Sequence, residues 1–192
     1  MISNRKIQGL SPLAVLALTA CGGGNTTVGF GDLIAKSKNL YFEKGPLNNL
    51  LAFLDYNHNG VLDGGEPSGR TNILGNVILV PTQDSYTIVG ISDSLTQDIS
   101  TNDFLPGVVL KAPSESTMVT PITTLMEEGN LTATQVTKVL GLPVSFDPLT
   151  FSAFGNNPSA PANPDQIGSL AVEKISHQMM STLKAFAAAA KG

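Results

Sequence analysis

The sequence predicts an α+β protein: a small antiparallel β-sandwich with a calcium loop, followed by two short helices and one long helix. Three observations lead to this class. Short runs of β-type residues between residues 39 and 112 are separated by proline, glycine and asparagine. A loop with calcium-binding spacing interrupts these runs. After residue 112, helix caps and helix stops replace the strand pattern, so strands precede helices.

The first 20 residues have the features of a secretory signal. Asn4-Arg5-Lys6 is basic, Leu10 to Leu18 is a short apolar run, and Leu18-Thr19-Ala20 precedes Cys21. The run is too short to span a bilayer. Leu-Thr-Ala-Cys also resembles the cleavage box of bacterial lipoproteins, which implies that Cys21 becomes the lipid-modified first residue of the mature chain. The alternative is ordinary secretory cleavage, which would leave Cys21 as a free thiol because the sequence has one cysteine.

Residues 21–38 are predicted to form a flexible tether, because Gly22 to Thr27 contains only small or polar residues. The 192-residue chain has a formal net charge of −4. Removal of the leader would take away two positive charges, Arg5 and Lys6, and leave a net charge of −6. Nucleic acid is therefore not an expected partner. Hydrophobic residues make up 42% of the chain, which is enough for a packed core.

Residues 39–112 are predicted to form the β-sandwich, because short strands with regular turn residues are typical of that fold. Strands are expected at 39–43, 47–54, 77–80, 85–91 and 107–111. The acidic residues of the segment 92–103 do not match a calcium spacing, so this segment is interpreted as a solvated loop.

The calcium loop is the sequence DYNHNGVLDGGE, from Asp55 to Glu66. Calcium prefers six to eight oxygen ligands, a glycine at position 6 permits the sharp bend, and a glutamate at position 12 closes the shell. Gly60 occupies position 6. The predicted ligands of Ca²⁺ are Asp55, Asn57, Asn59, the carbonyl of Val61, Asp63 and Glu66. The alternative is a turn without a metal, since Asn, Asp and Gly also favour tight turns by themselves.

The residues after the loop exclude a helix-loop-helix sensor. Pro67, Ser68 and Gly69 follow Glu66, and a helix does not propagate through them. The predicted order is therefore strand, loop, strand. Solvent exposure is expected for His58, because position 4 of the loop supplies no ligand.

The stretch KGPLNNLLAFLDYNHNGVLDGGEPSGRT resembles the calcium-binding B-type repeats of bacterial surface proteins. These repeats, found in SD-repeat proteins, are small prealbumin-like β-sandwiches with a D-x-N-x-N-G-x-x-D-x-x-E-P loop. The resemblance covers about residues 39 to 112. Such repeats usually continue with T-D-x-x-G-x-Y, whereas this chain has Asn72 and Val77 where the pattern has Asp and Tyr. The resemblance implies a structural or adhesive role at the cell surface.

Residues 113–192 are predicted to be a helical segment that packs on the sandwich. Thr120-Pro121 caps a helix that stops at Gly129, and Thr132 with Gln135 forms a capping box for a second helix that ends at Gly141. Residues 146–163 are interpreted as a spacer. Asn163-Pro164-Asp165 is expected to start the long helix. Its predicted apolar stripe contains Ile167, Leu170, Ala171, Ile175, Met179, Leu183 and Phe186.

No catalytic set is predicted. Ser176 and His177 are neighbours on the long helix and do not face each other. Zinc-protease, phosphate-loop and serine-hydrolase motifs are absent from the sequence. The expected function is a lipid-anchored, calcium-stabilised structural or adhesive module of the bacterial envelope, on the outer membrane or cell surface, with a protein or polysaccharide partner. The alternative is a periplasmic lipoprotein that binds or hydrolyses a small ligand between sandwich and helices.

Overall fold

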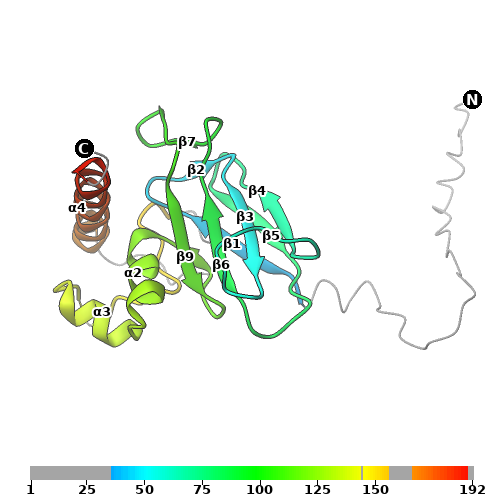
Figure 1. Cartoon of the computed structure of the whole chain (residues 1–192). Coiled ribbons are helices and arrows are strands. Elements are labelled where there is room, and N and C mark those ends of the chain that lie inside the picture. Colours follow the sequence, from blue (N-terminus) through cyan, green and yellow to red (C-terminus); the bar gives the residue numbers. More distant parts are fainter. Residues whose placement is uncertain (1–35, 144, 156–165, 190–192) are drawn as a thin grey trace, which may run out of the picture.

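The computed structural model describes residues 36–143, 145–155 and 166–189 (Figure 1). In these residues the strands come first and the helices follow, so the predicted α+β class is confirmed. The elements are β1 (Lys38–Phe42), β2 (Leu47–Asn48), β3 (Leu51–Asp55), β4 (Ser68–Arg70), β5 (Asn76–Leu79), β6 (Thr87–Ile91), β7 (Gln97–Asp98), β8 (Asp103–Phe104), β9 (Val109–Pro113), β10 (Met118–Val119), α2 (Pro121–Gly129), α3 (Ala133–Val139) and α4 (Gln166–Ala189). The predicted leader, Cys21 and most of the predicted tether lie outside the described residues.

The strands form three sheets, with the orders β4-β3-β6-β9, β10-β1-β5 and β2-β7-β8. All neighbouring strands are antiparallel except β1 and β10, which run parallel with Tyr41 opposite Met118. The prediction of a wholly antiparallel arrangement is therefore wrong at this pair. The chain leaves β9, turns at Pro113–Ser116 and reaches the edge of β1 in the same direction as β1.

One apolar core joins the sheet containing β1 to the four-stranded sheet. Leu40 and Phe42 of β1 are fully buried, and so are Leu54 of β3 and Ile88 of β6. Gly90 of β6 allows this close approach, because a Cβ atom there would lie 2.5 Å from the ring of Phe42. Large side chains on one sheet thus fill the space left by small residues on the other.

The order of strand, loop and strand around Asp55–Glu66 is as predicted. β3 enters the loop and β4 leaves it, and the two strands pair antiparallel with Phe53 opposite Ser68. On its other side β3 pairs with β6, where Asp55 is opposite Thr87. β3 is thus held on both sides, so the loop begins from a rigid position in the sheet.

The helices lie on the side of the four-stranded sheet where β9 forms the edge (Figure 1). Helix α2 contacts β9 through two hydroxyl groups: Thr123 donates to the Lys111 carbonyl at 2.9 Å, and Thr124 accepts from the Lys111 N–H at 2.9 Å. The capping box predicted at Thr132 is present, and Thr120 forms a second one with Thr123. Polar contacts as well as apolar ones therefore hold the first helix on the sheet.

The interpretation of residues 146–154 as a spacer is wrong. The rings of Phe146 and Phe151 meet edge to face with 5.0 Å between their centroids. Both rings pack with Leu149 against the buried cluster of the helices. The Leu149 carbonyl also accepts the N–H groups of Thr117 and Met118. The segment therefore packs against the core of the helices, which includes Val172 of α4 as well as residues of α2 and α3.

The apolar stripe predicted for α4 is also wrong in part. Leu170 is 66% exposed, whereas Val172, Ser176 and Met180 are buried at spacings of four residues. Val172 packs on the helices, and Met180 joins the core between the sheets. Apolar residues occupy two adjacent faces of α4, and contact with α2 decides which face is covered. The structure does not describe residues 163–165, where the helix was predicted to start. It also does not describe the side chains of Ile167, Leu183 and Phe186.

No helix in the described ranges combines the length and the hydropathy needed to cross a membrane.

Candidate metal site

Asp55 is the first residue of the candidate loop and the last residue of β3. Its side chain is almost fully buried, with 1% relative exposure. One carboxylate oxygen accepts the N–H of Asn59 at 3.2 Å, and the other accepts the N–H of Gly60 at 2.6 Å. Gly60 has φ = 75°, the left-handed conformation that glycine adopts most readily. The bend predicted at position 6 is therefore present, and Asp55 holds it from the sheet side.

Three predicted ligands converge at the exposed tip of the loop. The side-chain amides of Asn57 and Asn59 donate to the same oxygen of Asp63, at 2.8 Å and 2.7 Å. These two hydrogen bonds hold the pKa of Asp63 below its usual value. Each amide oxygen in turn accepts a backbone N–H two residues further on, from Asn59 and Val61. The structure therefore brings positions 3, 5 and 9 of the loop together.

Glu66 at position 12 closes the loop by bridging its two ends. One oxygen of its carboxylate accepts the N–H of Tyr56 at 2.9 Å, and the other accepts the N–H of Asp63 at 2.9 Å. This is the role of a closing residue, since a single side chain connects the start of the loop to its last turn. The side chain of Val61 is 58% exposed, as expected if only its backbone carbonyl serves the site.

The loop also contacts the helical part of the protein. His58 is exposed, as predicted, but its Nδ1 lies 2.8 Å from the hydroxyl of Thr87. The Thr87 hydroxyl donates to Glu127 of α2 at 2.7 Å, so His58 Nδ1 is the donor in the first contact. Beside this chain of contacts, Lys111 pairs with Glu128 at 2.6 Å. The loop is thus connected through β6 to the last turn of α2.

The donor chemistry of the loop fits a hard cation, because carboxylate, amide and carbonyl oxygens are the ligands that calcium prefers. The N–H groups on Asp55 and Glu66 take part of each carboxylate's accepting capacity, which is about four lone-pair sites. Among the described residues, however, no three His, Cys, Asp or Glu side chains gather closely enough to hold a metal ion. Asp55, Asp63 and Glu66 are each bound within the loop to N–H groups rather than grouped around one point. Calcium binding at these residues stays a prediction.

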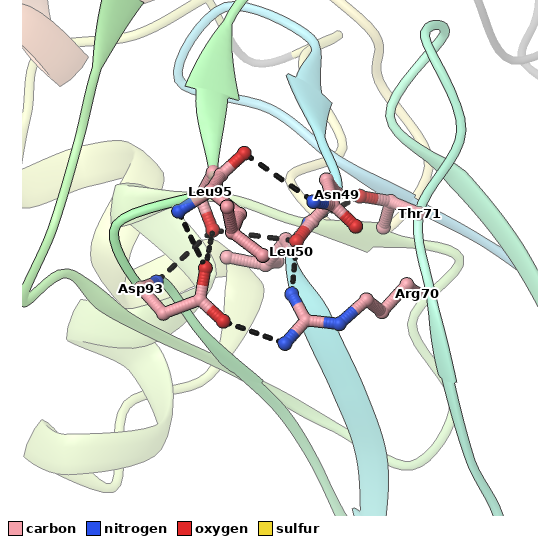
Figure 2. Close-up of polar contacts among 7 residues, drawn as sticks. Asn49, Leu50, Arg70, Thr71, Asp93 and Leu95 are labelled. Atoms are coloured by element: carbon pink, nitrogen blue, oxygen red, sulfur yellow. Dashed lines mark hydrogen bonds and ion pairs between the residues drawn. The ribbon is translucent and has the colours of Figure 1, made fainter.

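A second polar cluster, which the sequence did not indicate, joins the end of β4 to the loop after β6 (Figure 2). The guanidinium of Arg70 donates to the Asn49 carbonyl and to Asp93, both at 2.6 Å. The hydrogen bond from Arg70 is the main reason that the pKa of Asp93 lies below its usual value. Asn49 has φ = 62°, so this cluster fixes a left-handed bend between β2 and β3. Its hydrogen bonds join segments of the protein's own chain, which is a structural role.

The interpretation of residues 92–103 as a solvated loop is wrong at Asp98. Asp98 is fully buried and forms an ion pair of 2.8 Å with Lys44, which is 7% exposed. Burial by itself would raise the pKa of Asp98, but hydrogen bonds from Lys44 and Ser100 bring it below its ordinary value. Gly45 permits the pair, since a Cβ atom there would overlap Asp98. The partner of Asp98 is 54 residues away in the chain, so no local pattern could have indicated this pair.

Glu43 is a buried carboxylate that the sequence did not indicate. It lies just after β1, is 3% exposed and accepts the hydroxyl of Ser152 at 2.7 Å. Burial raises the pKa of its carboxyl to about 7, against the hydrogen bonds from Ser152 and from the backbone of Ala153 and Phe154. Glu43 therefore connects the sheet to the segment that leads to α4.

No protein-family model, curated protein or solved structure matches this chain. The two residues considered for catalysis lie in different surroundings: Ser176 is buried, whereas His177 is partly exposed and lies 4.0 Å from Glu173 on the same helix.

Proposed function

We propose that this protein is a lipid-anchored, calcium-stabilised structural or adhesive module of the bacterial cell surface. The observation that carries the proposal is the meeting of Asn57, Asn59 and Asp63 within 2.8 Å at the tip of a loop that bends at Gly60. The oxygen-bearing residues at positions 1, 3, 5, 9 and 12 match the spacing of calcium loops. The pairing of β3 with β4 as strand, loop, strand agrees with the resemblance to B-type β-sandwich repeats.

Calcium would act on stability through the ends of this loop. Asp55 belongs to β3, and Glu66 stands just before β4, so one ion held by both would link two strands of the four-stranded sheet. The contacts of His58 with Thr87, and of Thr87 with Glu127, would extend that effect to α2. The residues that would hold the ion are the predicted set: Asp55, Asn57, Asn59, the Val61 carbonyl, Asp63 and Glu66. When bound, calcium would neutralise charge on the three carboxylates of the loop.

Calcium is expected to stabilise the protein by about 2.7 kcal/mol when its free concentration is 100 times the dissociation constant. Positions 3 and 5 are the neutral Asn57 and Asn59, so only three carboxylates attract the ion. We expect a dissociation constant on the order of 10⁻⁴ M, the range of extracellular calcium modules. Urea unfolding at increasing calcium concentrations measures both the stabilisation and the dissociation constant. The control is Asp84→Asn, because Asp84 is an exposed acidic residue outside the loop.

Two variants of the loop are expected to change calcium binding in opposite directions. Glu66→Gln should lose most of the calcium-dependent stabilisation, and its metal-free stability should fall by about 1 kcal/mol, because a neutral amide does not accept from both Tyr56 and Asp63. Asn59→Asp should lower metal-free stability through repulsion with Asp63 but tighten calcium binding by about tenfold, or about 1.4 kcal/mol. If both variants respond to calcium as the parent does, the loop is only a turn.

Cys21 is expected to be the lipid-modified first residue of the mature protein, on the basis of Leu18-Thr19-Ala20-Cys21 after a basic and apolar leader. More than one acyl chain would give stable membrane attachment. Mass spectrometry of the native protein from the bacterial envelope tests this expectation, with Cys21→Ser as control. An unmodified Cys21, or a mature chain that starts elsewhere, would contradict it. The surface partner of such an anchored module would be a protein or a polysaccharide.

A further inference from the structure

A cavity of about 580 Å³ lies between β9 and the three helices of the described chain. Its wall comes from all four elements: Val109 of β9, Leu125 of α2, Val139 of α3, Leu140 just after α3, and Ile175 and Met179 of α4. Cavities of about 300–1,000 Å³ with mainly apolar walls are typical of small-molecule sites. The size and the lining of this cavity therefore suit a ligand of that class.

The fold leaves the wall of this cavity incompletely covered. Val109 is 45% exposed and Val139 is 71% exposed, although both are large apolar residues. Leu125, Leu140 and Met179 are only partly buried at the edge of the helical core. Removing such apolar surface from water is favourable. Hydrocarbon inside the cavity would thus gain contacts that the protein itself does not supply.

The polar residues that line the cavity are Thr124, Glu128, Gln178 and Thr182, and the charge of Glu128 restricts the charge of a ligand. The hydroxyl of Thr124 is engaged, because it bonds to the backbone of Lys111 and Thr120. Glu128 lines the cavity, and its carboxylate is paired with the Lys111 ammonium at 2.6 Å. An anionic ligand would meet Glu128, and a cationic ligand would compete with Lys111 for it. The mutual neutralisation of this pair favours an uncharged ligand.

We propose that this cavity binds an uncharged small molecule that is mostly hydrocarbon, such as a long-chain alcohol. The cavity lies outside the Asp55–Glu66 loop, so this proposal does not depend on calcium binding there. Met179 gives the wall a flexible, polarizable surface that accommodates chains of different shape. The site then adds ligand binding to a protein otherwise proposed to have a structural role.

The test is titration of the full chain with the uncharged fluorescent probe N-phenyl-1-naphthylamine, with and without calcium. We expect one saturable site with a dissociation constant on the order of 10⁻⁶ M. Dodecanol should displace the probe at concentrations at least tenfold lower than dodecanoate, its anionic counterpart. Equal displacement by dodecanoate, or binding that does not saturate, would overturn the proposal.

Two variants locate the binding. Val109→Lys and Val139→Lys place a charge on the part of the wall that comes from β9 and the part that comes from α3, and each should weaken probe binding at least tenfold. Both positions are exposed, so the variants should melt as the parent does. The matched control is Ile78→Lys on β5, which is 62% exposed and does not line the cavity. If both cavity variants bind the probe as the parent does, the probe binds at another place, such as the apolar leader. That result would overturn the proposal that the cavity is the binding site.

Discussion

Replacing Asp98 with alanine is expected to lower the free energy of unfolding by about 3–5 kcal/mol, because the Lys44 ammonium would remain buried without its partner. Asp98 has no exposed surface, and its carboxylate also accepts the hydroxyl of Ser100 at 2.6 Å. The variant therefore removes the partner of a buried charge together with a hydrogen bond from a neighbouring turn. Urea unfolding at neutral pH, compared with the parent, measures the change.

The matched control is the exposed ion pair of Arg70 and Asp93, whose side chains are 40% and 39% exposed. Asp93→Ala should cost about 1 kcal/mol or less, since solvent screens this pair. Replacing both Lys44 and Asp98 with apolar residues of similar size should recover much of the loss, because no unpaired charge remains. Equal small losses in Asp98→Ala and Asp93→Ala would mean that burial of Asp98 has no energetic consequence.

Stability is expected to fall as the pH rises from about 5 to about 8, and Glu43→Gln should remove this slope. Burial raises the pKa of Glu43 from 4.5 to about 7. Between these two values the folded protein keeps a proton that the unfolded chain has released, so folding becomes less favourable as the pH rises. At about 1.36 kcal/mol for each unit, the full effect is roughly 3 kcal/mol. It is complete once the pH exceeds the folded pKa.

Urea unfolding of parent and Glu43→Gln at four pH values between 5 and 8 tests this expectation, because the difference between the two curves isolates Glu43. Glu115→Gln serves as control, since Glu115 is exposed and should leave the slope unchanged. If the difference in stability between parent and Glu43→Gln does not change with pH, the pKa of Glu43 is the same in the folded and unfolded states, which would contradict the expectation.

Local sequence determined several features without help from the rest of the fold. Thr132 and Gln135 predicted a capping box because the two side chains need only each other and their own backbone. Pro67 excluded a helix after the loop for a similar reason, as proline removes a backbone donor. Gly60 was predicted at a sharp bend and has a positive φ. Such features depend on interactions within a few residues, which the sequence displays directly.

The ends of the longer strands were also predictable to within a few residues, because turn residues mark them. The two-residue strands β7, β8 and β10 were missed, and β2 was predicted as one continuous strand with β3. A strand of two residues is too short to show a hydrophobic alternation, and β7, β8 and β10 form because partner strands reach them. Asn130 was missed as the left-handed residue after α2, since Gly129 beside it was the expected stop.

Burial was decided by the tertiary structure alone. Nothing in the local sequence marks Glu43 or Asp98 as buried, yet each bonds to a residue more than 50 positions away. The same holds for α4, where contact with α2 selects the face of Val172 over that of Leu170. The candidate loop depends on both local sequence and tertiary structure. The spacing of its oxygen-bearing residues is local, whereas the position of Asp55 is fixed by the pairing of β3 with β4 and β6. Backbone preference acts over neighbours in the chain, whereas burial depends on distant segments that the fold brings together.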